Sequence, residues 1–151
     1  VTSPRLVPFK AEHMFAFPNR DTSILQEMRF AIDKERKGPA FTAVVNDRII
    51  GCGGIILLWP GVGMAWVAVA PDIKHYGVWL TRNVRRALRD IRRALNLHRV
   101  EAIVLADDSR NLAWIRLLGF CNENDIAQAY TQDKRDVVRF ELVRKDESSN
   151  V

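Results

Sequence analysis

The sequence predicts an α+β fold in which a mixed sheet of about seven strands is flanked by about four helices, as an α/β sandwich of three layers. Two observations carry this prediction. A buried strand at Val67–Val69 leads into a long amphipathic helix and then into another Val- and Ile-rich strand, and short strands joined by tight turns precede it. A strand, helix and strand in succession form a parallel crossover, whereas tight turns form antiparallel hairpins. The sheet is therefore expected to be mixed.

Composition favours one globular domain over residues 1–144, followed by a polar tail at residues 145–151. The chain has 151 residues, of which 48% are hydrophobic and 27% charged, so it can bury a core. Its net charge of +5 favours an anionic partner. Cys52 and Cys121 form no disulfide pattern and are expected to be inert buried thiols. The three histidines are dispersed, so we expect no metal, and the absence of a leader pattern favours the cytoplasm.

The first predicted segments are, in chain order, a strand at Arg5–Phe9, a short helix at Lys10–Phe17 and a helix from Asp21 or Thr22 to Lys37. In the second helix, Leu25, Met28 and Ile32 are spaced to form one buried face. Gly38 and Pro39 end that helix.

The segment Ile49–Ala70 contains 22 residues without a charge, a length that could cross a bilayer. Its glycines and Pro60 interrupt it, and its β-branched residues favour two buried strands joined by a turn. We therefore expect a hairpin and no membrane span. A second hairpin is predicted just before it, where the turn Asn46-Asp47 follows a strand at Phe41–Val45.

The long helix begins near Gly77 or Val78 and has two unlike faces. Its apolar residues recur at three- and four-residue steps and form a core-facing stripe: Leu80, Val84, Ala87, Leu88, Ile91, Ala94 and Leu95. Its arginines lie on the other side: Arg82, Arg85, Arg86, Arg89, Arg92 and Arg93. The unpaired N–H groups of a first helical turn attract anions, so a phosphate is the natural ligand at the strand-to-helix connection.

The last third of the chain alternates strands and a helix. Arg99–Leu105 is predicted to be a buried strand parallel to Val67–Val69. Asp107, Asp108 and Ser109 offer N-cap groups to a helix that ends at Leu118, with Gly119 as its C′ residue. Strands at Ala127–Tyr130 and Val137–Val143 complete the sheet.

Three stretches resemble the GNAT (Gcn5-related) acyltransferase superfamily. They are the hairpin AVVNDRIIGCGGI at Ala43–Ile55, the acyl-CoA motif VAVAPDIKHYGVWL at Val67–Leu80, and DDSRNLAWIRLLGF at Asp107–Phe120. Their order matches the family and covers roughly residues 40–121. The resemblance implies a GNAT-like sheet and an N-acyltransferase that transfers an acetyl group from acetyl-CoA to an amine.

The resemblance also implies a set of coenzyme-binding positions. The strand residues that would pair with the pantetheine arm are Val67, Ala68 and Val69. The loop residues that would contact the pyrophosphate are Lys74, His75, Tyr76, Gly77, Val78 and Trp79, and Asn111 matches the later motif. Lys74 replaces the usual Arg or Gln, and Trp79 replaces a second Gly or Ala. An indole at that position would fill the site or require a rearranged loop.

The catalytic residues are not determined by the resemblance. The proton donor of this family is often a Tyr four residues before the Gly-Phe pair, and here that position is Ile115. Glu27, Glu101 and Tyr76 are weak catalytic candidates, and each is also explained as a solvated or structural residue.

Three functions therefore compete. The first is an acyltransferase acting on a small-molecule or protein amine, which we favour slightly. The second is a GNAT-like protein that binds without catalysing, similar to small proteins of tailed bacteriophages, some of which travel in the virion; its location would then be the host cytoplasm or the virion. The third uses the arginine face of Arg82–Arg93 to bind nucleic acid or an acidic partner. A homo-oligomer is left open.

Overall fold

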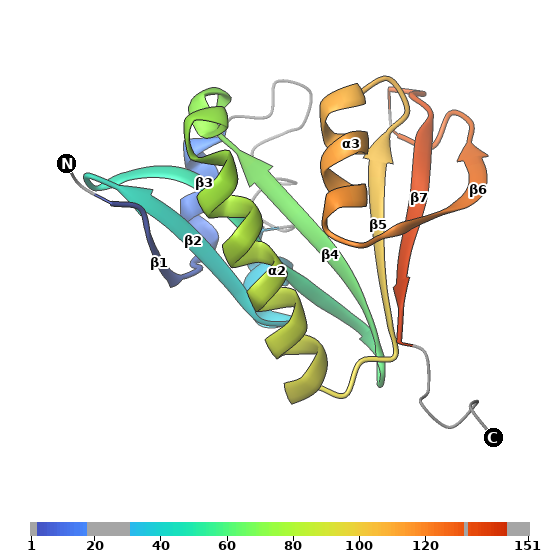
Figure 1. The fold of residues 1–151 in the computed structure, drawn as a ribbon, viewed down its shortest axis with the longest axis horizontal. Helices are drawn as coiled ribbons and strands as arrows, with labels where there is room; N and C mark the ends of the chain where they lie inside the picture. Colours follow the sequence, from blue (N-terminus) through green and yellow to red (C-terminus); the bar gives the residue numbers. More distant parts are fainter. Residues whose placement is uncertain (1–2, 18–30, 132, 145–151) are drawn as a thin grey trace. The chain divides into compact units, whose positions relative to one another are not determined.

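A computed structural model describes residues 3–17, 31–131 and 133–144 (Figure 1). The described strands form one seven-stranded sheet in the order β1-β2-β3-β4-β5-β7-β6. Its neighbouring strands pair in both antiparallel and parallel fashion, so the predicted mixed sheet is confirmed. Internal contacts divide the chain into two compact units, one of residues 1–57 and 65–82 and one of residues 58–64 and 83–151.

The first unit begins with three antiparallel strands. β1 (Arg5–Pro8) pairs with β2 (Ala40–Val45), which pairs with β3 (Arg48–Trp59). The two residues between β2 and β3, Asn46 and Asp47, have φ angles of 49° and 62°. A type I′ hairpin turn requires positive φ at both central positions, and Asn and Asp tolerate it. The predicted turn is therefore confirmed.

Helical segments lie between β1 and β2. The predicted short helix is the 3-10 helix η1 (Ala11–Ala16). Residues 31–36 are helical and belong to the helix predicted to end at Lys37, whereas its predicted start at Asp21 or Thr22, with Leu25 and Met28, lies outside the described residues. Ala31 is buried and Ile32 is exposed, so the prediction that Ile32 is buried is wrong. The buried face of this helix includes Ala31 and leaves Ile32 outside it, because adjacent helical side chains point about 100° apart.

The uncharged segment Ile49–Ala70 forms strands, as predicted. β3 continues through a turn at Pro60 and Gly61 into β4 (Val62–Val69). Gly61 has a φ of 87°, and a Cβ there would lie 2.4 Å from the His98 ring. The turn therefore requires glycine for both its dihedral angle and its space. None of the helices in the described part of the chain has the length and apolarity that a membrane crossing needs.

A 3-10 helix, η2 (Pro71–Tyr76), follows β4 and leads into α2 (Gly77–Ala94). The predicted helix start near Gly77 is confirmed. The predicted apolar stripe is buried or half-buried from Leu80 to Ile91, but Ala94 and Leu95 are exposed.

The end of α2 is a Schellman motif. Asn96 has a φ of 50° and serves as the left-handed C′ residue. The Leu97 N–H donates to the Arg92 carbonyl at 2.9 Å, and the Asn96 N–H donates to the Arg93 carbonyl at 3.3 Å. These two bonds satisfy carbonyl groups that the last helical turn leaves without partners. Leu97 is fully buried and fixes the chain as it turns toward the next strand.

The second unit contains the parallel crossover. β5 (Arg99–Leu105) runs parallel to β4, as predicted, and pairs with Val62–Met64. On its other side β5 is antiparallel to β7 (Val137–Val143). α3 (Ser109–Leu117) follows β5. β5, β7 and α3 with the residues after it contribute many of the buried side chains of this unit, among them Val100, Ala102, Ile115, Phe120, Val138 and Phe140.

One late strand differs from the prediction. β6 is Cys121–Ala127, whereas the sequence predicts a strand at Ala127–Tyr130. Residues 128–130 form a turn, and Ala129 has a φ of 48°. β6 lies at the edge of the sheet and pairs only with β7, so it tolerates a polar sequence with low strand propensity. Its first residue, Cys121, is exposed, so the prediction of two buried thiols holds only for Cys52.

Candidate functional site

The connection from β4 to α2 is helical from Pro71 onward. The Ala70 N–H donates to the Ile50 carbonyl at 2.9 Å, and the Ile73 N–H donates to the Ala70 carbonyl at 3.0 Å. Gly77 has φ −59° and ψ −42°, so η2 continues into α2 without a non-helical residue between them. A 3-10 helix uses its N–H groups in internal bonds. The sequence predicts free N–H groups at the start of α2; the structure instead places the beginning of the helical path at Pro71.

The inward side of this connection is part of a hydrophobic core. Ile73, Tyr76 and Trp79 are three residues apart and pack against the buried cluster of Ala43, Val45 and Ile50. Residues at this spacing lie one above another on a 3-10 turn. The Trp79 indole is thus a packing group, and the loop adopts an arrangement in which the bulky residue faces the core.

The outward side of the connection carries two polar side chains, an exposed valine and a glycine. Lys74 and His75 are exposed, and Val78 is 77% exposed. No heavy atom outside the local helix lies within 4 Å of a Cβ placed at Gly77. Since the Gly77 φ is one that any residue adopts, neither dihedral angle nor packing requires glycine there. A glycine in this position leaves the backbone open to a ligand.

The predicted strand positions lie at the end of β4. Val67 is exposed, and Ala68 and Val69 are half-buried. A Cβ at Gly53 of β3 would approach the Trp66 carbonyl oxygen to 3.1 Å, which is tighter than ordinary contact. Glycine in β3 therefore allows β4 to lie close to it.

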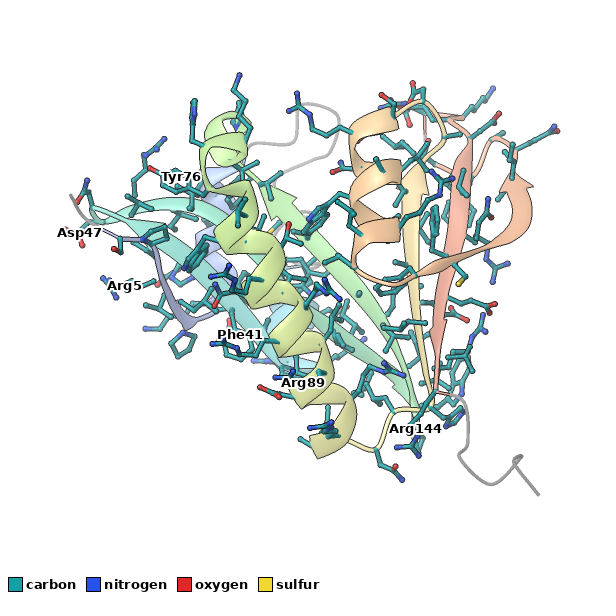
Figure 2. The ribbon with its side chains drawn as sticks, viewed as in Figure 1. Arg5, Phe41, Asp47, Tyr76, Arg89 and Arg144 are labelled. Atoms are coloured by element: carbon teal, nitrogen blue, oxygen red, sulfur yellow. The ribbon has the colours of Figure 1, made fainter. Side chains whose placement is uncertain are left out.

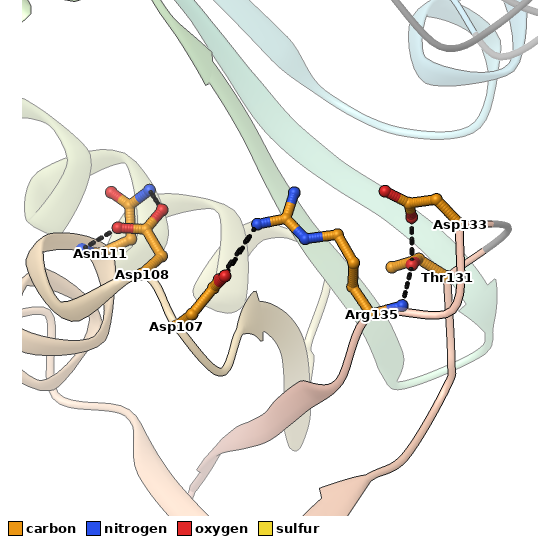
Figure 3. Close-up of polar contacts among 6 residues, drawn as sticks. All are labelled: Asp107, Asp108, Asn111, Thr131, Asp133 and Arg135. Atoms are coloured by element: carbon orange, nitrogen blue, oxygen red, sulfur yellow. Dashed lines mark hydrogen bonds and ion pairs between the residues drawn. The ribbon is translucent and has the colours of Figure 1, made fainter.

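The second predicted motif forms the start of α3. Asp108 is the N-cap residue: its Oδ1 accepts the Asn111 backbone N–H at 3.1 Å, and its Oδ2 accepts the Asn111 side-chain N–H at 2.6 Å (Figure 3). The neighbouring Asp107 pairs with Arg135 at 3.1 Å. The amide of Asn111 is thus bound to a carboxylate within its own helical turn, and the N-terminus of α3 is filled by the chain itself.

The weak catalytic candidates lie in unlike surroundings. Glu27 lies outside the described residues. Glu101 accepts a hydrogen bond from Arg99 Nε at 2.9 Å, and the same guanidinium donates to Glu141 at 2.6 Å. This sharing compensates two carboxylates that are directly opposite in the β5–β7 register. Tyr76 packs in the core described above. Ile115, at the position where the family's Tyr is expected, is a buried residue with 8% exposure.

Two polar groupings in the first unit have no sequence motif. His13 Nδ1 accepts the Lys10 backbone N–H at 3.2 Å and lies 2.7 Å from Thr42 Oγ1, which lies 3.5 Å from Cys52 Sγ. Burial raises the pKa of the Cys52 thiol, and the hydrogen bond with Thr42 partly offsets this. The residues come from three distant segments, so no local spacing reveals them.

The other grouping joins Lys34 and Trp66. The Lys34 ammonium lies 5.3 Å from the centroid of the Trp66 ring, and Phe9 contacts the same ring edge-on. Burial lowers the pKa of Lys34, and the charge of Asp33 partly offsets this. Within the part of the chain that the structure describes, no group of three His, Cys, Asp or Glu side chains is arranged to hold a metal ion.

No protein-family model and no curated protein sequence matches this chain. Solved structures do share its fold. A ribosomal-protein-S5-alanine acetyltransferase from Vibrio fischeri superposes with a TM-score of 0.74 at 16% identity, over 97% of this chain and 98% of that one. The spermidine/spermine N-acetyltransferase SpeG from Vibrio cholerae gives 0.69 at 16% identity, over 93% of this chain and 95% of SpeG. A SpeG complex with manganese ions gives 0.68 at 16% identity, over 93% and 92%. These proteins are GNAT acetyltransferases, and the chain has their fold.

Proposed function

We propose that this chain is an N-acyltransferase that takes the acetyl group of acetyl-CoA and transfers it to an amine. The observation that carries the proposal is the open surface at Gly77, next to exposed Lys74 and His75, in a chain with the GNAT fold. A fold alone hosts many activities, so the proposal depends on this site.

The outward residues of the connection suit the pyrophosphate of coenzyme A. Lys74 supplies a positive charge, and the His75 ring supplies a hydrogen-bond donor. A Cβ at Gly77 would meet open space, so a glycine there lets phosphate oxygens approach this surface of the helix. In this proposal Val67–Val69 bind the pantetheine arm through backbone groups, and Trp79 holds η2 against the core.

The acceptor is an amine whose identity we leave to experiment. The printed names of the similar structures suggest two classes for testing, a polyamine such as spermidine and the N-terminal alanine of a ribosomal protein. The reaction requires loss of an amine proton and protonation of the departing thiolate. With Ile115 at the position of the expected Tyr, solvent or another residue has to supply the second proton.

Ile115 also favours a second candidate function, that of a protein that binds without catalysing transfer. A buried, apolar Ile115 is what a GNAT-fold protein that binds coenzyme or a partner without catalysing transfer would have. The solved structures that share the fold give no support to a bacteriophage origin, so this candidate is stated only as a binding protein.

Binding of acetyl-CoA tests the proposal. A ligand that binds only the native state raises the melting temperature by mass action, so millimolar acetyl-CoA should raise it for the unaltered chain. Gly77→Ala should weaken binding at least tenfold by covering the open backbone, whereas the control variant Val143→Ala, at an exposed position of β7, should bind normally. No shift in any of the three proteins would contradict the coenzyme site.

Transfer is measured separately. Release of free thiol from acetyl-CoA on addition of spermidine or of an alanine-terminated peptide would support the acyltransferase. Coenzyme binding with no thiol release across a broad amine panel would favour the non-catalytic candidate.

A further inference from the structure

The second half of α2 carries more positive charge than its own acids compensate. Between Arg82 and Arg93 the helix has six arginines and one acid, Asp90, which lies 3.5 Å from Arg89 Nε. Five of the arginines are exposed, and Arg92 is half-buried. Like charges three or four residues apart repel each other on a helix. The excess of arginines therefore favours binding of an anion from outside the helix.

Arg92 differs from the other five in having a buried donor. Its Nε is buried and has no hydrogen-bond partner among the described residues. Buried donors are nearly always paired in native proteins, so this group needs an explanation. Capping does not supply one, because the Arg92 and Arg93 carbonyls already accept backbone N–H groups in the Schellman motif.

A second guanidinium is held near the same end of the helix. Arg144 follows β7; its Nη2 donates to Asn96 Oδ1 at 3.1 Å, and its backbone N–H donates to the His98 carbonyl at 3.0 Å. Figure 2 shows Arg144 at the end of β7 and Arg89 on α2. Burial first, and then the charge of Arg144, lower the pKa of Arg92. Asn96 is four residues after Arg92, so its hydrogen bond holds the Arg144 guanidinium at the end of α2 that carries Arg92.

We propose that Arg92 and Arg144, with Arg89 beside them, form a binding site for a phosphate group. Its oxygens would accept from the guanidinium groups of Arg92 and Arg144, so attraction to the anion would replace the repulsion between the cations. The C-terminus of a helix itself disfavours an anion, so the arginines have to supply all of the attraction. Arg85 and Arg89 extend the same side of α2, which favours a ligand with several phosphates.

Titration calorimetry with inorganic tripolyphosphate at constant ionic strength tests the site. Arg92→Gln and Arg144→Gln should each weaken binding about tenfold or more, the loss expected for a charge-assisted hydrogen bond. Arg86→Gln is the matched control, because it removes the same charge from a position about 120° around the helix from Arg92, and it should weaken binding less than about threefold. No binding by the unaltered chain, or an equal loss in the control, would overturn the site.

The source of the phosphate is distinguished by a second titration with single-stranded oligonucleotides. Affinity that rises with length and falls steeply with salt, and that Arg92→Gln weakens, identifies a nucleic-acid backbone. If the oligonucleotides bind no more tightly than tripolyphosphate does, the ligand of the site is a free polyphosphate. The Arg92→Gln and Arg144→Gln proteins should remain folded, and acetyl-CoA should raise their melting temperatures as much as it raises that of the unaltered chain. The acetyl-CoA response therefore tests the coenzyme proposal, and the tripolyphosphate titration tests the phosphate site independently of it.

Discussion

The two strand-to-helix connections of this chain are built in opposite ways. After β5, Asp108 accepts the backbone N–H of Asn111, so a carboxylate of the chain fills the start of α3. After β4, the N-cap residue of η2 is Ala70, whose side chain cannot accept an N–H; Asp72 is the one acid of η2, and Lys74 and His75 are exposed at its end. The carboxylates of the connection after β5 repel an anion, whereas Lys74 in the connection after β4 attracts one. Similar backbone topology therefore yields a helix end filled by the chain itself in one place and the proposed coenzyme site in the other.

The largest expected effect comes from the packing that holds the connection between β4 and α2 in place. Trp79→Ala should lower the free energy of unfolding by about 2–4 kcal/mol, somewhat less than for a fully buried Trp, because the ring is half-buried against Ala43, Val45 and Ile50. Denaturant unfolding measures it. Val78→Ala, in the exposed neighbour, should change stability by less than about 0.5 kcal/mol. Equal effects of the two substitutions would mean that the connection is not anchored by its inward side.

The next effect tests the Asp108 cap at the start of α3, in the connection after β5. Asp108→Ala should cost about 1 kcal/mol, because the Asn111 N–H loses its acceptor. Asp108→Ser keeps a capping oxygen and should recover most of that loss. Thermal unfolding of the two variants provides the comparison, and a loss that Ser does not recover would assign the effect to charge.

A smaller effect, of opposite sign, is expected at Gly77. Gly77→Ala should raise the free energy of unfolding by about 0.5–1 kcal/mol without ligand, since Ala is the better helix former and its Cβ enters open space. Stabilisation combined with loss of acetyl-CoA binding would show that the glycine serves the ligand. A destabilised variant would show that the fold requires it.

The smallest effect belongs to the ion pair beside the capped helix. Asp107 and Arg135 are 3.1 Å apart but largely exposed, so their attraction is weakened by solvent (Figure 3). Arg135→Gln should cost less than about 1 kcal/mol, and the cost should shrink in high salt. A larger, salt-independent loss measured by denaturant unfolding would point to a structural role for Arg135 beyond charge.

Sequence patterns predicted what depends on local chemistry and missed what depends on distant neighbours. The Asn46–Asp47 turn, the start of α2 and the Gly119 C′ residue follow from dihedral preferences and periodicity, and the structure confirms them. The β6 position was hidden because an edge strand needs no apolar alternation. The inward orientation of Trp79 and the approach of Arg144 to Arg92 depend on tertiary packing, which spacing along the chain does not encode.

The two edge strands of the sheet also bear on how copies of the chain meet. β1 is four residues long and ends in Pro8, which has no N–H to offer. β6 has a polar sequence and an irregular register with β7 between Asn122 and Ile126. Short strands, prolines and register breaks prevent a strand of another molecule from extending a sheet. In concentrated solution these features of β1 and β6 therefore disfavour growth of the sheet into cross-β aggregates.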